Sequence, residues 1–155
     1  MIDREPVTQG LQALLAALTE RPVGRRTVPL DADGTPAPPP YTILYPLDKT
    51  DDDKTLADNN KAAVVDYQAT FVSGPKSGEA DSRGGDEQVQ WMTDRGWKVV
   101  QRPADGSPGY VHTLNVGPGV GCWHREAREA GGTSDANDGI MTGVIRYRLY
   151  LETTA

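Results

Sequence analysis

The sequence predicts an α+β domain with about four strands, two helices and long loops. Residues 63–72 alternate apolar and polar side chains, and residues 141–152 repeat the pattern. This period of two is typical of strands in a sheet with one buried face. The positions expected to be buried are Val65, Tyr67, Ala69 and Phe71 in the first segment and Ile145, Tyr147, Leu149 and Leu151 in the second.

A first helix is predicted over residues 3–20. Pro6 suits the first turn, and Asp3 and Glu5 lie where the helix dipole favours anions. The apolar stripe consists of Val7, Leu11, Leu14, Leu15 and Leu18. Burying each leucine against a sheet contributes about 1.5–3 kcal/mol, so we expect this helix to dock.

A second helix is predicted over residues 86–100, with Asp86 as a possible N-cap. Its buried stripe is formed by Val89, Met92, Gly96, Val99 and Val100. Gly96 would permit a close approach to the sheet. Trp91 projects to the opposite side, where it is either half-covered by a loop or part of an interface, since tryptophan is enriched at interface hot spots.

Two further strands are predicted, over residues 41–47 and 110–116. Pro46 should end the first or place it at a sheet edge, because proline cannot donate to the ladder. The acidic stretch 48–61 is expected to be a solvated loop. It lacks the glycine and terminal glutamate of a calcium loop.

The remaining connections are rich in proline or glycine. Residues 21–40 contain the run Pro36-Ala37-Pro38-Pro39-Pro40 and predict an extended arm, which is either a stiff spacer or a recognition ligand. Residues 117–139 form a glycine-rich region expected to be mainly loop. Within it, residues 122–130 fit either a strand or a short helical turn.

Size and charge restrict the classes of function. The 155 residues fit one domain, 1–155, and the net charge of −6 excludes a broad basic surface that binds phosphates. One cysteine, Cys122, cannot form an intrachain disulfide and fits a reducing compartment. Neither an export signal nor a membrane span is visible.

No cluster of reactive residues predicts catalysis. His112, Cys122 and His124 lack the spacing of a zinc site. Cys122 and His124 also lack the third, orienting group of a thiolate pair. The glycines of 117–121 are not followed by the lysine and hydroxyl residue of a phosphate loop. We therefore predict no catalytic residue, no cofactor and no metal.

The order of elements resembles the tail terminator (tail completion) proteins of long-tailed bacteriophages, especially those of actinobacteria. The resembling phrases are residues 41–47 (YTILYPL), 66–73 (DYQATFVS) and 90–95 (QWMTDR), with the closing strand phrase 146–150 (RYRLY). The resemblance covers most of the chain and departs from the family in 48–61 and 117–139.

That resemblance implies two helices on one face of a mainly antiparallel sheet. It also implies a homo-hexameric ring that caps the major tail tube protein, ends tube growth and docks to the head-side connector or stopper protein. DNA would pass through the lumen without specific binding. The expected location is the head-proximal end of the virion tail, after synthesis in the host cytoplasm.

The hypothesis assigns surfaces to this ring. Contacts between subunits or with partners are expected from Trp91, Arg95, Trp123, Pro38, Pro39 and Pro40, and a lumen or solvent surface from Asp51, Asp52 and Asp53. Two alternatives remain open: a head–tail stopper or connector protein, and a small enzyme or ligand-binding module on the same scaffold, since fold does not fix function.

Overall fold

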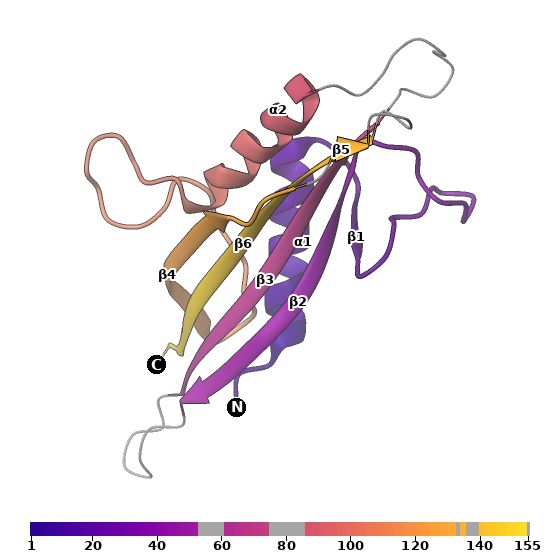
Figure 1. The fold of residues 1–155 in the computed structure, drawn as a ribbon. Helices are drawn as coiled ribbons and strands as arrows, with labels where there is room; N and C mark the ends of the chain where they lie inside the picture. The colour runs from indigo at the N-terminus through magenta and orange to yellow at the C-terminus, as the bar shows by residue number, and fades with distance from the viewer. Residues whose placement is uncertain (53–60, 75–85, 133, 136–139, 155) are drawn as a thin grey trace.

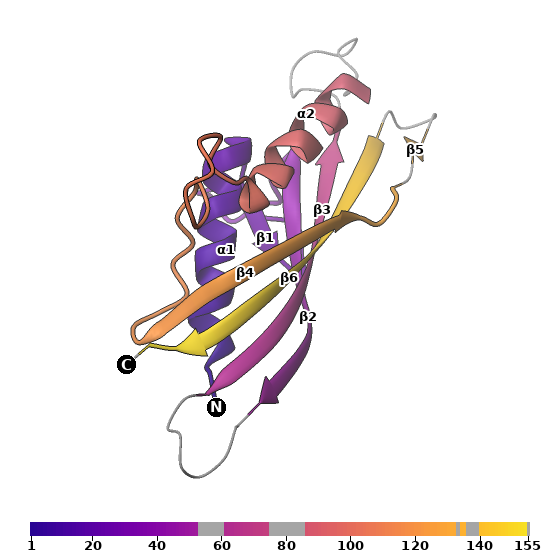
Figure 2. The same cartoon turned by 90° about the vertical axis from the view of Figure 1, so that its left-hand side faces the viewer.

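Two helices pack on one face of a mixed sheet, which confirms the predicted α+β class (Figures 1 and 2). The computed structural model describes residues 1–52, 61–74, 86–132, 134–135 and 140–154. The helices are α1 (Arg4–Thr19) and α2 (Asp86–Trp97), followed by the 3-10 turn η1 (Lys98–Val100). The strands are β1 (Val23–Arg25), β2 (Tyr41–Asp52), β3 (Ala62–Ser73), β4 (Val120–Glu129), β5 (Ser134–Asp135) and β6 (Ile140–Thr153).

The sheet runs in the order β1-β2-β3-β6-β4, and β5 also pairs with β6. Only the β1–β2 pair is parallel; the other strand pairs of the described residues are antiparallel. The two strands predicted from alternation, β3 and β6, pair along their whole lengths at the centre. Their predicted inward positions are all buried and form the core with the helices.

Helix α1 begins and ends where the sequence predicts. The Asp3 carboxylate accepts a hydrogen bond from the Glu5 amide at 3.2 Å, which satisfies one free donor of the first turn. Glu20 closes the helix in the left-handed conformation, with φ of 55°. Its buried face includes Val7, Leu11, Leu15 and Leu18.

Helix α2 lies directly on the sheet because Gly96 has no side chain. A Cβ atom at this position would lie 2.5 Å from Phe71 Cζ and 3.0 Å from the Tyr147 hydroxyl. The predicted close approach is therefore confirmed. Met92 and Val99 of the predicted stripe are fully buried.

Strand β2 is longer than predicted, so the expected loop 48–61 is wrong for its first residues. The ladder with β3 shifts register between Pro46 and Lys49 and then continues to Asp52, which pairs with Ala62. Pro46 was expected to end the strand or to lie at a sheet edge, and the edge alternative is correct: β1 pairs only with Thr42–Leu44, and a bulge follows Pro46. Residues 53–60 lie outside the described part of the chain.

Residues 110–116 do not form the predicted strand. This segment packs its apolar side chains, Leu114 and Val116, into the core, but its backbone joins no sheet. The glycine-rich region instead contains strand β4, so the loop predicted over 117–139 is wrong for Val120–Glu129. The alternative of a strand over 122–130 is the correct one.

The proline-rich connection is not an extended arm. Its residues Val23–Arg25 form β1 beside β2, and the chain then folds back through the Leu30–Pro36 bridge. The Ala37 amide donates to the Pro29 carbonyl at 2.8 Å. Backbone hydrogen bonds therefore fix this segment against the rest of the molecule, which composition did not predict.

Arg125 holds the 101–118 connection against the outer strand β4. The side chain is 8% exposed, and its Nη1 donates to the carbonyls of Val99 and His112 at 2.9 and 2.8 Å. The Tyr110 ring lies 4.4 Å from the guanidinium, and its hydroxyl accepts a 2.7 Å hydrogen bond from the Arg125 amide. These contacts bury the Arg125 guanidinium between β4 and the connection.

Candidate interaction surfaces

One face of the sheet is left bare by the helices. In Figure 1 this face is toward the viewer, and Figure 2 shows both helices on the other side. The side chains that alternate with the buried core point to it from four strands. They include Tyr45, Asp66, Gln68, Glu126, Arg128, Arg146, Arg148 and Tyr150.

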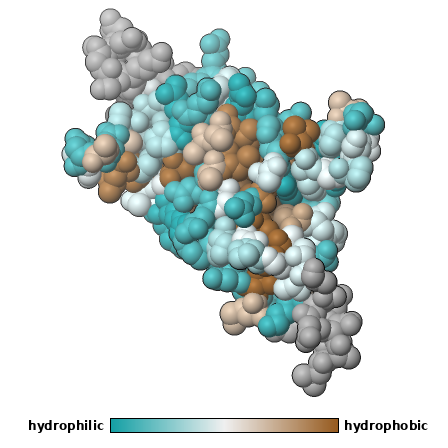
Figure 3. Space-filling view, turned by 180° about the vertical axis from the view of Figure 1, so that it is seen from behind, coloured by the Kyte–Doolittle hydropathy of each residue, from teal (hydrophilic) through white to brown (hydrophobic). Residues whose placement is uncertain are grey.

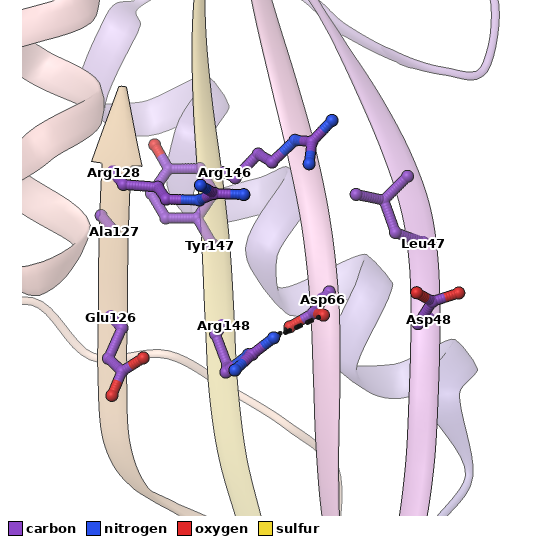
Figure 4. Close-up of a pocket in the computed structure, with 9 residues that line it drawn as sticks. All are labelled: Leu47, Asp48, Asp66, Glu126, Ala127, Arg128, Arg146, Tyr147 and Arg148. Atoms are coloured by element: carbon purple, nitrogen blue, oxygen red, sulfur yellow. Dashed lines mark hydrogen bonds and ion pairs between the residues drawn. The ribbon is translucent and has the colours of Figure 1, made fainter. Parts of the chain in front are cut away.

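A hollow of about 420 Å³ lies on this bare face. Figure 4 shows that its charged side chains come from β2, β3, β6 and β4. Arg148 makes a bidentate pair with Asp66, with Nε–Oδ1 and Nη2–Oδ2 distances of 2.9 and 3.2 Å. The hydrogen bonds to Asp66 raise the pKa of Arg148, so this arginine is charged at every relevant pH.

The cross-strand pairing of β3, β6 and β4 places these charged side chains in two neighbouring rows. One row crosses the sheet through Glu126, Arg148 and Asp66, and Asp48 from the β2 bulge adds a third carboxylate. Two residues further along, Arg128 lies opposite Arg146. The rows are about 7 Å apart, the length of two strand residues. The first is therefore acidic overall and the second basic.

An aromatic cluster lies at the acidic end of the bare face. The ring of Trp123, which is 58% exposed, lies 5.7 Å from His124 and 5.3 Å from Tyr150, and the last two rings are 5.2 Å apart. The extra residue in β4 creates this cluster, because the register shifts between Cys122 and His124. The cluster and Glu126 are called the aromatic cup below.

The carboxylate of Glu126 completes the aromatic cup. Its Oε1 lies 3.2 Å from His124 Nε2 and accepts a 3.3 Å hydrogen bond from the Tyr150 hydroxyl. The side chain is 50% exposed. The cup thus offers ring faces and a negative charge to solvent, a combination that suits a cationic group.

Trp91 and Arg95 form a second exposed patch, on α2. Trp91 is 39% exposed, and the Arg95 guanidinium lies 5.0 Å from the centroid of its ring. The stacking places a positive charge over an aromatic face at the surface of the helix layer. The structure therefore brings two predicted contact residues together in one pair, separate from Trp123.

The helix side also carries apolar surface. Figure 3 shows apolar atoms gathered in the middle of this side, surrounded by polar ones. A groove there runs between α1 and the 113–118 segment, lined by Pro6, Ala13, Leu14, Ala17, Thr113 and Pro118. Its lining is continuous with the helix stripe that the sequence predicted.

The other predicted contact residues differ in their access to solvent. Pro38 is exposed, Pro39 is half-buried and Pro40 is buried. Asp51 is exposed in β2, and its carboxylate lies 3.1 Å from Lys49 Nζ. Asp52 ends β2, and Asp53 lies outside the described residues.

Within the described residues, no group of three or more His, Cys, Asp or Glu side chains is placed to hold a metal ion. Burial raises the pKa of the Cys122 thiol, which makes it a poorer nucleophile at neutral pH. What the surfaces offer chemically is recognition through ring faces, carboxylates and guanidinium groups.

Sequence reasoning missed His124 and Tyr150 of the aromatic cup and the arginines of the basic row. A signal was present, since aromatic and charged residues occupy the outward positions of residues 146–150. Their partners on β4 could not be assigned, because residues 122–130 fitted either a strand or a short helical turn.

Neither helix, nor any other helical segment in the described ranges, is both long and apolar enough to cross a bilayer. No model of a known protein family matches the sequence, and no curated protein matches it at a significant level.

Proposed function

We propose that this chain is a structural subunit of a long-tailed bacteriophage, a tail terminator of which six copies form a ring. The ring caps the tail tube, ends tube growth and joins the tail to the head-side connector. The chain acts by shape and surface chemistry and makes or breaks no bond. Its place is the head-proximal end of the tail, after synthesis in the host cytoplasm.

The observation that carries this proposal is the one-sided fold. Helices cover one face of the sheet, while the other face is bare and presents aromatic and charged groups across four strands. Tryptophan, tyrosine and arginine, the residue types enriched at interface hot spots, are exposed on both sides of the sheet. A ring subunit needs two such surfaces, because each copy contacts two neighbours.

The charge of the chain agrees with DNA passing through such a ring. Six copies would carry roughly six times −6, about −36. A negative wall repels the phosphate backbone, so DNA would slide without adhering. In this proposal Asp51 faces the lumen or solvent, and Pro38 and Pro39 meet a partner.

Electron microscopy of the purified protein and of virions tests the proposal. Closed rings of six copies, and labelled protein at the head-proximal end of tails, are the expected results. The purified ring should also bind the end of tail tubes in preference to the isolated connector. The reverse preference would identify a stopper or connector protein, and a persistent monomer absent from virions would overturn the proposal.

A further inference from the structure

The aromatic cup and the Trp91–Arg95 pair are complementary in charge. The cup combines three rings with the carboxylate of Glu126, while the pair combines one ring with a guanidinium. Within the described residues, no carboxylate forms an ion pair with Arg95. A guanidinium that meets both an aromatic face and a carboxylate gains cation–π attraction and charge-assisted hydrogen bonds together.

The arginine opposite Glu126 in the β4–β6 ladder already has a partner. Arg148 hydrogen-bonds both oxygens of Asp66. Among the residues that the structure describes, Glu126 contacts His124 and Tyr150 through one oxygen, Oε1. Its half-exposed carboxylate is therefore the acceptor that an incoming cation would meet at this end of the bare face.

The two patches cannot meet within one copy. The cup lies on the bare face, whereas α2 packs on the opposite face and turns Trp91 to solvent. A second copy can bring its Arg95 to the cup, and its own cup is then open to a third copy. A contact between two different patches repeats head to tail and closes into a ring when the rotation between copies allows.

Resting on the proposed function, we infer that the ring contact is formed by Trp91 and Arg95 of one copy inserted against Trp123, Tyr150 and Glu126 of the next. Arg95 is pre-oriented by the ring of Trp91, which lowers the cost of ordering it on association. The occupant of the cup is thus a second copy of this chain.

Charge reversal tests the pairing. The variants Glu126→Arg and Arg95→Glu each place like charges across the proposed contact, so each alone should lose at least tenfold in ring affinity. Mixed in equal amounts, the two variants should recover rings, because opposite charges then meet at every contact: the native Arg95–Glu126 pair alternates with a pair of introduced charges. Native mass spectrometry with a mass label on one variant should find three copies of each.

The control is Arg21→Glu, a charge reversal at an exposed arginine after the end of α1 that belongs to neither patch. It should leave assembly within about twofold of the parent chain. Thermal melting of each variant checks that it folds. The double variant Glu126→Arg/Arg95→Glu should form rings by itself, which would show that neither substitution prevents assembly by misfolding the chain.

The outcomes separate this pairing from the ring itself. If the parent chain forms rings and the single reversals also do, the pairing is wrong while the ring stands. Single variants that lose rings, with neither mixture nor double variant recovering them, also contradict the pairing. A parent chain that remains monomeric at high concentration, and is absent from virion tails, overturns both proposals.

Discussion

The hydroxyl of Tyr147, on β6, donates a 2.8 Å hydrogen bond to the backbone carbonyl of Gly96, on α2. Both groups are buried, and the missing side chain of Gly96 is what allows the helix to come this close. Because Tyr147 lies fully within the core, burial raises its pKa strongly. One contact therefore fixes the distance between the helix layer and the central strands.

Gly96→Ala should destabilise the protein. A methyl group would lie 2.5 Å from Phe71 Cζ, and overpacking of this kind costs about 1–3 kcal/mol. Alanine recovers up to about 1 kcal/mol through helix propensity, so a net loss is expected in the free energy of unfolding measured with urea. The exposed substitution Glu87→Ala, on the same helix, should change it by less than about 0.5 kcal/mol. An unchanged Gly96→Ala midpoint would contradict the close packing.

The buried hydrogen bond between Thr8 and Tyr67 should be measurable by a double-mutant cycle. The two hydroxyl oxygens are 2.8 Å apart and link α1 to β3. Thr8 also donates to the Arg4 carbonyl at 3.2 Å, so it keeps one partner when Tyr67 is replaced. Tyr67→Phe should cost about 0.5–1.5 kcal/mol. Combined with Thr8→Val, the costs should not add; strict additivity would show that the two hydroxyls do not interact.

Arg125→Leu should be among the most destabilising single changes in β4. It leaves the carbonyls of Val99 and His112 without their buried donor, at about 1–3 kcal/mol for each unsatisfied group. Arg128→Leu is the matched control, since Arg128 lies on the same strand and faces the open hollow. The thermal midpoint should fall for the first variant and stay nearly constant for the second. Equal midpoints would exclude a structural role for Arg125.

Stability should decline in alkaline solution. Burial raises the pKa of Cys122 above its ordinary value of 9.0, and it raises the pKa of Tyr67 and Tyr147 above 10.0. The folded state thus holds these protons more tightly than the unfolded chain. Their contribution to the free energy of unfolding is complete below about pH 9 and is lost as pH rises further.

Urea unfolding between pH 7 and 10.5 measures this dependence. Cys122→Ala should reduce the fall in the free energy of unfolding near pH 9. The thiol of the parent chain should react slowly with iodoacetamide at pH 8, because little thiolate is present. A thiol that reacts as fast as free cysteine would contradict its burial.

The centre of the fold could be predicted because its strands face a core on one side only. In β3 and β6, Tyr67 and Tyr147 stand among small and aliphatic inward residues, and polar residues alternate with them. Strand β4 lacks this alternation, because its inward position 125 is an arginine whose Nη1 donates to two carbonyls. Its pattern therefore contains almost no apolar alternation to detect.

The aromatic cup could not be assembled from sequence, since it depends on strand order. Trp123 and Tyr150 are far apart in the chain and meet only because β4 pairs with β6 and bulges at Trp123. The exposed tryptophans were visible individually. Their separation onto opposite faces of the sheet required the packing of α2, which the position of Trp91 alone does not specify.

The hydroxyl of Tyr110 accepts a hydrogen bond from the Arg125 amide on the free side of β4 and donates one to the Arg125 carbonyl at 3.4 Å. An unguarded outer strand is a template for fibril growth, because any extended chain can add to it. With both backbone groups of residue 125 already bonded, this template is interrupted at its middle. At this position a neighbouring chain cannot add as a further strand, so the ring contact proposed above would be made by side chains.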